Sequence, residues 1–229
     1  MEVYLDKTHK TIPISTLILT FESTEKIKEY APQLRGFFAT KFNEYQLLHQ
    51  HNADKFIYKY PLIQYKVIDG TPMVIGINEG TEVLKEIYDK FDEIRLGENS
   101  YKIMGKGIQI KNQDFGLTEE FHTHLFATPW FALSQKNYRS YYMAGTKVER
   151  NELLNRTLIG NLLSMSKTLD YNVPDRIKAS VNYRIKKGRL KSTNIMTFTG
   201  TFITNFLIPD YFGIGRSVSR GFGTVKRVS

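Results

Sequence analysis

Two histidines separated by a single residue, His49 and His51, are well suited to acid–base chemistry near neutral pH. Cutting RNA without a metal requires a base that takes the proton of the 2′-hydroxyl and an acid that protonates the leaving 5′-oxygen. Two imidazoles can fill these roles, while a lysine or arginine stabilises the charge of the phosphorane. An isolated His-x-His pair is, however, more often a loop or core feature. Metal binding is a further alternative, which the lack of cysteine and of clustered carboxylates does not favour.

A glycine-rich segment near the end of the chain could bind phosphate. Its glycines, arginines and serines are Gly213, Gly215, Arg216, Ser217, Ser219, Arg220, Gly221 and Gly223. Glycines reach positive φ, so successive N–H groups can point into one concavity, and the arginines add charge-assisted hydrogen bonds. The third glycine of a dinucleotide fingerprint is replaced by Val218, and no Gly-Lys-Ser/Thr of a P-loop is present. The alternative is a glycine hairpin that closes a β-rich domain.

A cluster of cations precedes this segment. Six basic residues fall within residues 178–191, which contain no acid: Lys178, Arg184, Lys186, Lys187, Arg189 and Lys191. The pattern predicts a basic β-hairpin whose tip is residues 186–189, able to follow the phosphates of RNA. The alternative is an exposed hairpin whose lysines prevent edge-to-edge pairing.

The elements that must position these residues follow the order β-α-β-β-α-β in the first half of the chain, the ferredoxin-like pattern. Strands are predicted over residues 11–21, 56–68, 72–77 and 100–110, and helices over residues 23–42 and 79–91. Pro32 marks the first turn of the main part of the first helix, and Asp69-Gly70 is a hairpin turn signal.

The second half reads as a variation on the first. Strands are predicted over residues 123–134, 178–185, 194–207 and 224–228, and a long helix starts at Thr146, which forms a capping box with Glu149. The second helix of the pattern is not visible. We therefore predict an α+β protein with two tandem ferredoxin-like (RRM-like) domains, residues 1–115 and 116–229, the second of them modified.

The composition indicates a folded protein without disulfides and with a basic second half. Of its 229 residues 41% are hydrophobic and none is cysteine, and no apolar run approaches the ~18 residues of a membrane span. We expect a soluble, cytoplasmic protein that does not bind membranes. Residues 1–114 carry a net charge of −1 and residues 115–229 one of +10. A basic half of this kind attracts a polyanion, although a solvated basic surface is the alternative.

The C-terminal pattern Gly213-x-Gly215, five residues, then Gly221-Phe222-Gly223 resembles the signature loop of the CRISPR repeat-processing endoribonucleases, in the repeat-associated mysterious protein superfamily. The sequence Leu34-Arg35-Gly36 is similar to the Leu-Arg-Gly that often opens the first helix in that superfamily. Two tandem ferredoxin-like units are the architecture of this family, so the resemblance covers most of the chain.

The resemblance implies a role for several residues. In the family, a catalytic histidine commonly lies in the loop after the first helix, which corresponds to His49 or His51 without deciding between them. By position, Tyr45 would be its partner and Lys55 would stabilise the phosphorane. The glycine-rich loop, Phe222 included, and the basic hairpin would bind the repeat RNA.

The resulting expectation is a metal-independent endoribonuclease that cleaves CRISPR repeat RNA into guide RNAs with 2′,3′-cyclic phosphate and 5′-hydroxyl ends, as the family's chemistry implies. It would need no cofactor and would act as a monomer or homodimer. One alternative is a non-catalytic member of the family that carries guide RNA in a CRISPR effector complex. Another is an unrelated RNA- or nucleotide-binding protein that reuses ferredoxin-like units.

Overall fold

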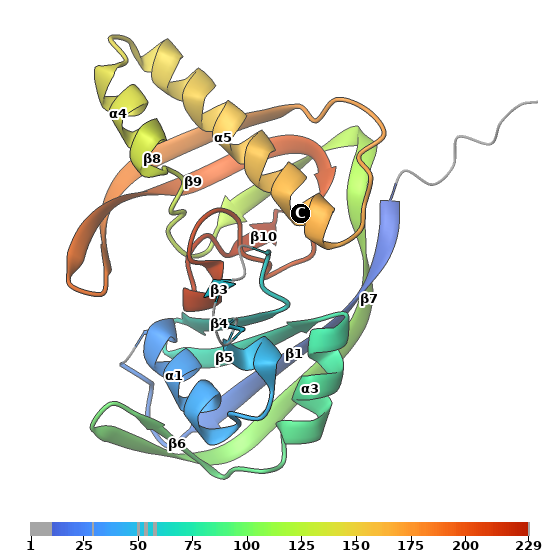
Figure 1. Cartoon of the computed structure of the whole chain (residues 1–229), viewed down its shortest axis with the longest axis vertical. Helices are drawn as coiled ribbons and strands as arrows, with labels where there is room; N and C mark the ends of the chain where they lie inside the picture. Colours follow the sequence, from blue (N-terminus) through green and yellow to red (C-terminus); the bar gives the residue numbers. More distant parts are fainter. Residues whose placement is uncertain (1–10, 29, 50, 53–54, 57–58, 229) are drawn as a thin grey trace, which may run out of the picture.

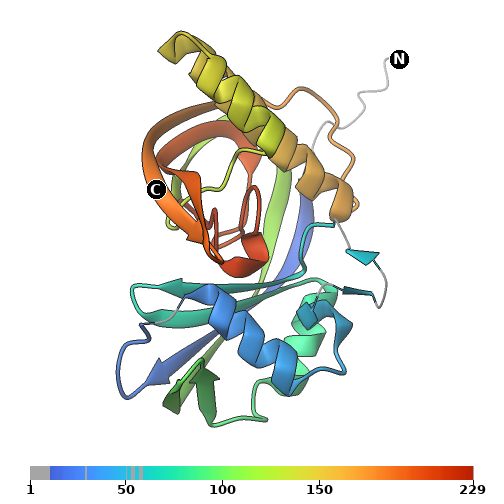
Figure 2. The same ribbon diagram turned by 60° about the vertical axis from the view of Figure 1, so that its left-hand side comes forward.

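The computed structural model describes residues 11–28, 30–49, 51–52, 55–56 and 59–228, with only the backbone of residues 51–52 and 55–56. Figure 1 shows two lobes stacked along the long axis of the molecule, and Figure 2 shows the same arrangement from another side. The lower lobe is built from the first half of the sequence and the upper lobe from the second half. A long strand, β7 (Asn99–Phe126), runs through both lobes (Figure 1).

The first half forms an antiparallel sheet covered by helices. Its strands β1 (Thr11–Ser23), β4 (Ile63–Ile68) and β5 (Thr71–Ile77) pair with β7 in the order β4-β5-β1-β7. Helices α1 (Ala31–Lys41) and α3 (Glu79–Ile87) pack on one face of this sheet, because apolar side chains alternate along β1. The smaller elements are α2 (Gln46–His49), β2 (His51–Asn52), β3 (Lys55–Phe56) and β6 (Glu93–Leu96). The predicted ferredoxin-like order is therefore confirmed.

The second half repeats this strand order. Strands β8 (Ala179–Leu190), β9 (Thr193–Leu207) and β10 (Val225–Arg227) pair with β7 in the order β8-β9-β7-β10. Helix α5 (Lys147–Thr168) crosses this sheet (Figure 1). Between β9 and β10, where the pattern requires a second helix, the described chain has only the 3-10 turn η1 (Val218–Arg220). The second unit is thus a modified ferredoxin-like fold, as predicted.

The two halves meet inside β7. Its N-terminal part pairs with β1 up to Gly116, and Gly116 is also the first residue that pairs with β9. Gly116 has a φ of 138°, a conformation that residues with a side chain rarely adopt. We propose this residue as the boundary between the domains, next to the position expected from the sequence.

Several predicted elements have different bounds in the structure. The first helix begins only at Ala31, and the predicted strand over residues 56–68 is divided into β3 and β4. The predicted strand over residues 123–134 ends at Phe126, and helix α4 (Gln135–Met143) follows. The sequence reading missed α4 because only Tyr141 of this helix is buried, so its residues show no apolar stripe.

Helix α5 follows the prediction closely. Thr146 caps the helix by accepting from the Glu149 N–H, and the Glu149 side chain accepts from the Thr146 N–H, which completes the capping box. The predicted stripe is buried: Leu154, Leu158, Leu162 and Met165 are at most 1% exposed, and Leu169, just after the helix, is 5% exposed. Although α5 is long, no helix in the described part of the chain has the length and apolar character needed to cross a membrane.

Candidate functional site

His49 lies in the first half, at the end of the short helix α2, where it is half-buried. Its Nε2 is 3.1 Å from the carbonyl oxygen of Asn43. Because a carbonyl only accepts hydrogen bonds, Nε2 must carry the proton, and the lone pair of the neutral ring is then on Nδ1. This tautomer presents an imidazole nitrogen that can take a proton, as the base in metal-free RNA cleavage must.

The other residues of the predicted catalytic loop are described only in part. His51 and Lys55 belong to the two-stranded ladder β2–β3, in which His51 pairs with Phe56 and Asn52 pairs with Lys55. This pairing brings the backbone of Lys55 back beside the segment that carries His51. The side chains of both residues lie outside the described part of the structure.

The hydroxyl of Tyr45, the expected partner of His49, has another hydrogen-bond partner. It donates to Oε2 of Glu86, on helix α3, at 2.8 Å. The hydrogen bond to Glu86 raises the pKa of Tyr45, because ionising the hydroxyl would place a second negative charge beside the carboxylate. In this structure the Tyr45 hydroxyl is thus bonded to Glu86, and its role as the partner of His49 stays a prediction. Sequence proximity says little about where a loop side chain points.

Arg35, on α1, is a positioning residue to which the sequence reading assigned no role. Its Nη2 donates to the carbonyl oxygen of His49, while the Tyr65 hydroxyl donates to the carbonyl of the preceding residue, Leu48, at 3.4 Å. Both side chains thus hold the end of α2. The sequence did contain a pointer to Arg35, because this residue is the central one of the Leu-Arg-Gly motif.

Arg35 also connects His49 to the glycine-rich loop. Burial lowers the pKa of Arg35, and the positive charge of Arg220 lowers it further. The Nε of Arg35 is buried and has no hydrogen-bond partner among the described residues. Two guanidinium groups therefore lie close enough to interact, and one of them is bonded to the backbone of His49. A phosphate group would stabilise this charge arrangement.

The glycine-rich loop packs on the first half of the chain. The Tyr60 hydroxyl donates to the carbonyl of Gly213 at 2.9 Å, and Oε1 of Gln64 accepts from the Gly213 N–H at 2.9 Å. The turn η1 contacts α1 and β4. A side chain at Gly221 would put its Cβ 2.7 Å from the Cβ of Ala31. Close packing requires glycine here, and the loop is held against the helix that carries Arg35.

The expectation that the glycines expose a concave row of N–H groups is wrong for most of the loop. The N–H groups of Gly213, Gly221 and Gly223 donate to Gln64, Val218 and Pro129, respectively. The Arg216 N–H donates to the carbonyl of Phe131 at 3.0 Å. Because these donors are used within the protein, the loop offers an anion mainly its side chains.

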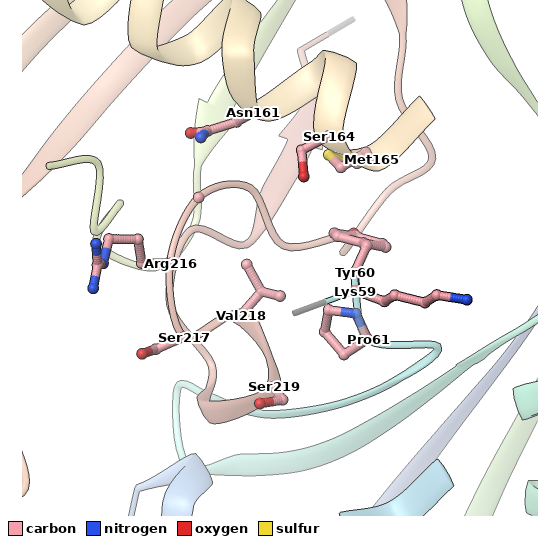
Figure 3. Close-up of a pocket in the computed structure, with 11 residues that line it drawn as sticks. Lys59, Tyr60, Pro61, Asn161, Ser164, Met165, Arg216, Ser217, Val218 and Ser219 are labelled. Carbon is pink, nitrogen blue, oxygen red and sulfur yellow. The ribbon is translucent and has the colours of Figure 1, made fainter. Parts of the chain in front are cut away.

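The side chains of the loop border a cavity of about 410 Å³ (Figure 3). Figure 3 shows the loop below helix α5, with the Lys59–Pro61 segment beside it. Arg216, Ser217 and Ser219 belong to its lining. Arg216 is exposed, and its guanidinium lies 5.3 Å from the centre of the Phe131 ring, which contacts Phe222 at 6.0 Å between ring centres.

The basic hairpin is present, but its tip lies elsewhere than predicted. Residues 186–189 are paired with residues 194–197 in the β8–β9 ladder, and the chain reverses at Lys191, which has a φ of 55°. Lys186, Lys187, Arg189 and Lys191 are all exposed. Successive side chains point to opposite faces of a strand, so Lys186 and Lys187 lie on opposite faces of the hairpin and do not form a compact tip.

Lys66, on β4, is buried beneath the glycine-rich loop. It is fully buried, and its Nζ donates at 2.9 Å to Oε1 of Gln64, the atom that also accepts the N–H of Gly213. Burial lowers the pKa of Lys66 to about 7. The charged form of this side chain is therefore disfavoured where the loop meets the first half of the chain.

Lys66 should make the stability of the fold depend on pH. A lysine in the unfolded chain has a pKa of about 10.4, so between pH 7 and 10 the unfolded state binds the extra proton. The free energy of unfolding should rise with pH there by about 1.4 kcal/mol per unit from this group. We expect the Lys66→Met variant to lose this slope and to be more stable than the parent at pH 6, as measured by urea unfolding at several pH values. Parallel pH profiles for both proteins would contradict the lowered pKa of the buried Lys66.

Comparison with known proteins identifies the class to which this fold and site belong. Sequence profiles of the Cas6b N-terminal domain and the Cas6b C-terminal domain match residues 12–114 and 116–228. Both halves of the chain thus match the CRISPR repeat-processing class, and the resemblance seen in the sequence is confirmed. Within that class, the chain belongs to the Cas6b family.

Individual relatives agree with this assignment. A crystal structure of Cas6b is 36% identical with a TM-score of 0.89, covering 95% of this chain and 100% of that one. A second structure, of the CRISPR RNA processing endoribonuclease Cas6b, is 35% identical with a TM-score of 0.76 and the same coverage. An uncharacterized protein of Methanocaldococcus jannaschii is 40% identical over 144 residues, 62% of this chain and 97% of that protein.

Proposed function

We propose that this chain is a metal-independent endoribonuclease that cleaves CRISPR repeat RNA to guide RNAs. The observation that carries the proposal is the placement of His49, whose Nε2 is hydrogen-bonded to the carbonyl of Asn43. The backbone of His49 is held by Arg35, which lies within electrostatic reach of Arg220 in the glycine-rich loop. Membership of the Cas6b family supports the substrate class, because one similar protein is described as a CRISPR RNA processing endoribonuclease.

The reaction follows from the chemistry of two imidazoles. One of His49 and His51 removes the proton of a 2′-hydroxyl, and the 2′-oxygen then attacks the adjacent phosphorus. The other histidine protonates the 5′-oxygen as the bond from phosphorus to that oxygen breaks. The products are a 2′,3′-cyclic phosphate and a 5′-hydroxyl. Arg35, Arg220 and Lys55 are the cations of this region available to stabilise the charge on the phosphorane.

RNA binding rests on the basic second half of the chain. Residues 115–229 have a net charge of +10, and only Asp210 is acidic after Asp175. Arg216 and the cations of the β8–β9 hairpin are exposed, so they can neutralise phosphates. Ser217 and Ser219 line the same cavity as Arg216 and can donate neutral hydrogen bonds.

A single incubation tests the proposal. Labelled CRISPR repeat RNA should be cut by the purified protein in the presence of EDTA, because the acid–base mechanism uses no metal. The 3′ end of the upstream product should resist ligation until its cyclic phosphate is removed, which distinguishes this chemistry from hydrolysis to a 3′-hydroxyl. RNA that is bound but remains intact would instead indicate a non-catalytic member of the family. If adding EDTA stops the cleavage, the metal-independent mechanism is contradicted.

A further inference from the structure

A second cavity continues the first along helix α5. Its volume is about 480 Å³, and both cavities have Asn161 and Arg216 in their walls. One cavity therefore lies on each side of Asn161 and Arg216. Together they extend from Lys59, past Arg216, to Ser140 on helix α4. We call these two adjoining cavities the α5 groove.

All charged residues in the walls of the α5 groove are positive. Lys59, Arg156 and Arg216 are in its walls, and none of the residues that line either cavity is Asp or Glu. All three cations are exposed. Because no carboxylate lines the groove, its positive charge attracts an anion, and its length fits a chain of phosphates better than a single one.

One face of α5 forms the floor of the groove. The lining residues of this helix include Arg156, Thr157, Gly160, Asn161 and Ser164, whose spacing of three or four residues places them on one side. Oδ1 of Asn161 accepts from Nε1 of Trp130 at 3.2 Å, which leaves the amide N–H groups of Asn161 as donors. The floor thus consists of small or hydrogen-bonding side chains beside the apolar stripe of the helix.

Packing within the chain does not explain Gly160. It lies in the middle of α5, where glycine is about 1 kcal/mol less favourable than alanine. A Cβ built at this position meets no atom within 4 Å, so no neighbouring element requires glycine. The absence of a side chain keeps the floor of the groove open at its midpoint.

We propose that the α5 groove binds an unpaired segment of the RNA substrate, with its phosphates on Arg156 and Arg216 and its backbone passing over Gly160. This inference rests on the proposed RNA-binding function. It adds a binding site for single-stranded RNA on the second half of the chain, beyond the glycine-rich loop. The glycine-rich loop forms one wall of the groove, so the bound strand passes beside the loop that also carries Arg220.

The Gly160→Gln variant tests this site, because it fills the groove without disturbing the fold. Glutamine is a better helix former than glycine and its Cβ enters open space, so the melting temperature should stay equal or rise. We expect its affinity for an oligouridylate of about 12 nucleotides to fall by about tenfold or more, measured by fluorescence anisotropy. The Arg156→Ala variant should lower the salt dependence of binding by about 0.7 in the logarithmic slope, as expected for one lost phosphate contact on a single strand.

Two matched variants on the same helix serve as controls. Lys167→Ala removes an exposed cation, and Leu163→Gln introduces the same amide side chain; neither position lines the groove. Both should bind the oligouridylate as the parent does. Unchanged affinity in Gly160→Gln and Arg156→Ala would overturn the proposal, as would an equal loss of binding to a blunt RNA duplex. Cleavage of repeat RNA by the parent protein tests the proposed function separately, whatever the groove variants show.

Discussion

Replacing both His49 and His51 by alanine should abolish cleavage of repeat RNA and leave RNA binding unchanged. Each proton transfer that an imidazole supplies contributes roughly 10²–10⁴-fold to the rate. The double variant should therefore cleave at least about 10⁴-fold more slowly than the parent in single-turnover assays with excess protein. Binding should persist, because the exposed cations of the second half are untouched.

The single variants and a neighbouring control sharpen this prediction. His49→Ala and His51→Ala should each lose most of the rate, since base and acid act in the same step. Gln46→Ala, at an exposed position of the same short helix α2, should cleave at the parent rate. A double variant that still cleaves at the rate of Gln46→Ala would rule out both histidines. Slow cleavage accompanied by weak binding would point to a structural role for this loop.

The second large effect that we expect is a loss of stability when Gly223, the last glycine of the loop, is replaced. Its φ is 66°, and a Cβ at this residue would lie 2.0 Å from the carbonyl oxygen of Ile214. Its N–H donates to the carbonyl of Pro129, and its own carbonyl accepts from the N–H of Ile214, both at 2.9 Å. The Gly223→Val variant must therefore break contacts that close the loop. We expect it to lose roughly 3–5 kcal/mol of unfolding free energy and to melt about 10 °C lower.

Gly36→Ala is the appropriate comparison for this variant. Gly36 is exposed in helix α1 and a Cβ there meets no atom within 4 Å, so this change should be neutral or slightly stabilising. Differential scanning calorimetry measures both melting temperatures, and a gel shift with repeat RNA measures binding. Gly223→Val should bind RNA weakly even below its melting temperature, because Arg216 and Arg220 lose their fixed positions. Parent-like stability in Gly223→Val would contradict the observed closure of the loop.

Local signals in the sequence were sufficient for the architecture. The capping box at Thr146 depends on residues three apart, and the stripe that includes Leu158 depends on helical periodicity, so both could be predicted without tertiary contacts. The strand order followed from the succession of apolar patterns and the Asp69-Gly70 turn. The glycine spacing near the C-terminus carried the resemblance that the Cas6b profiles confirm.

Long-range packing decided how the candidate site is assembled. The contacts of Arg35 with His49 and of Tyr60 with Gly213 join residues 14 and 153 positions apart, and no sequence periodicity specifies such pairs. No sequence pattern specifies the hydrogen bond from the Tyr45 hydroxyl to Glu86 on another helix either.

The chain by itself determined which elements form, where its charge gathers and which family it resembles, because these properties depend on residues close together in sequence. Only the tertiary structure decided that the two halves share β7, that the glycines serve close packing, and that α5 borders a groove. These features depend on the shapes of surfaces that meet when distant segments pack, and that complementarity is a property of the folded chain.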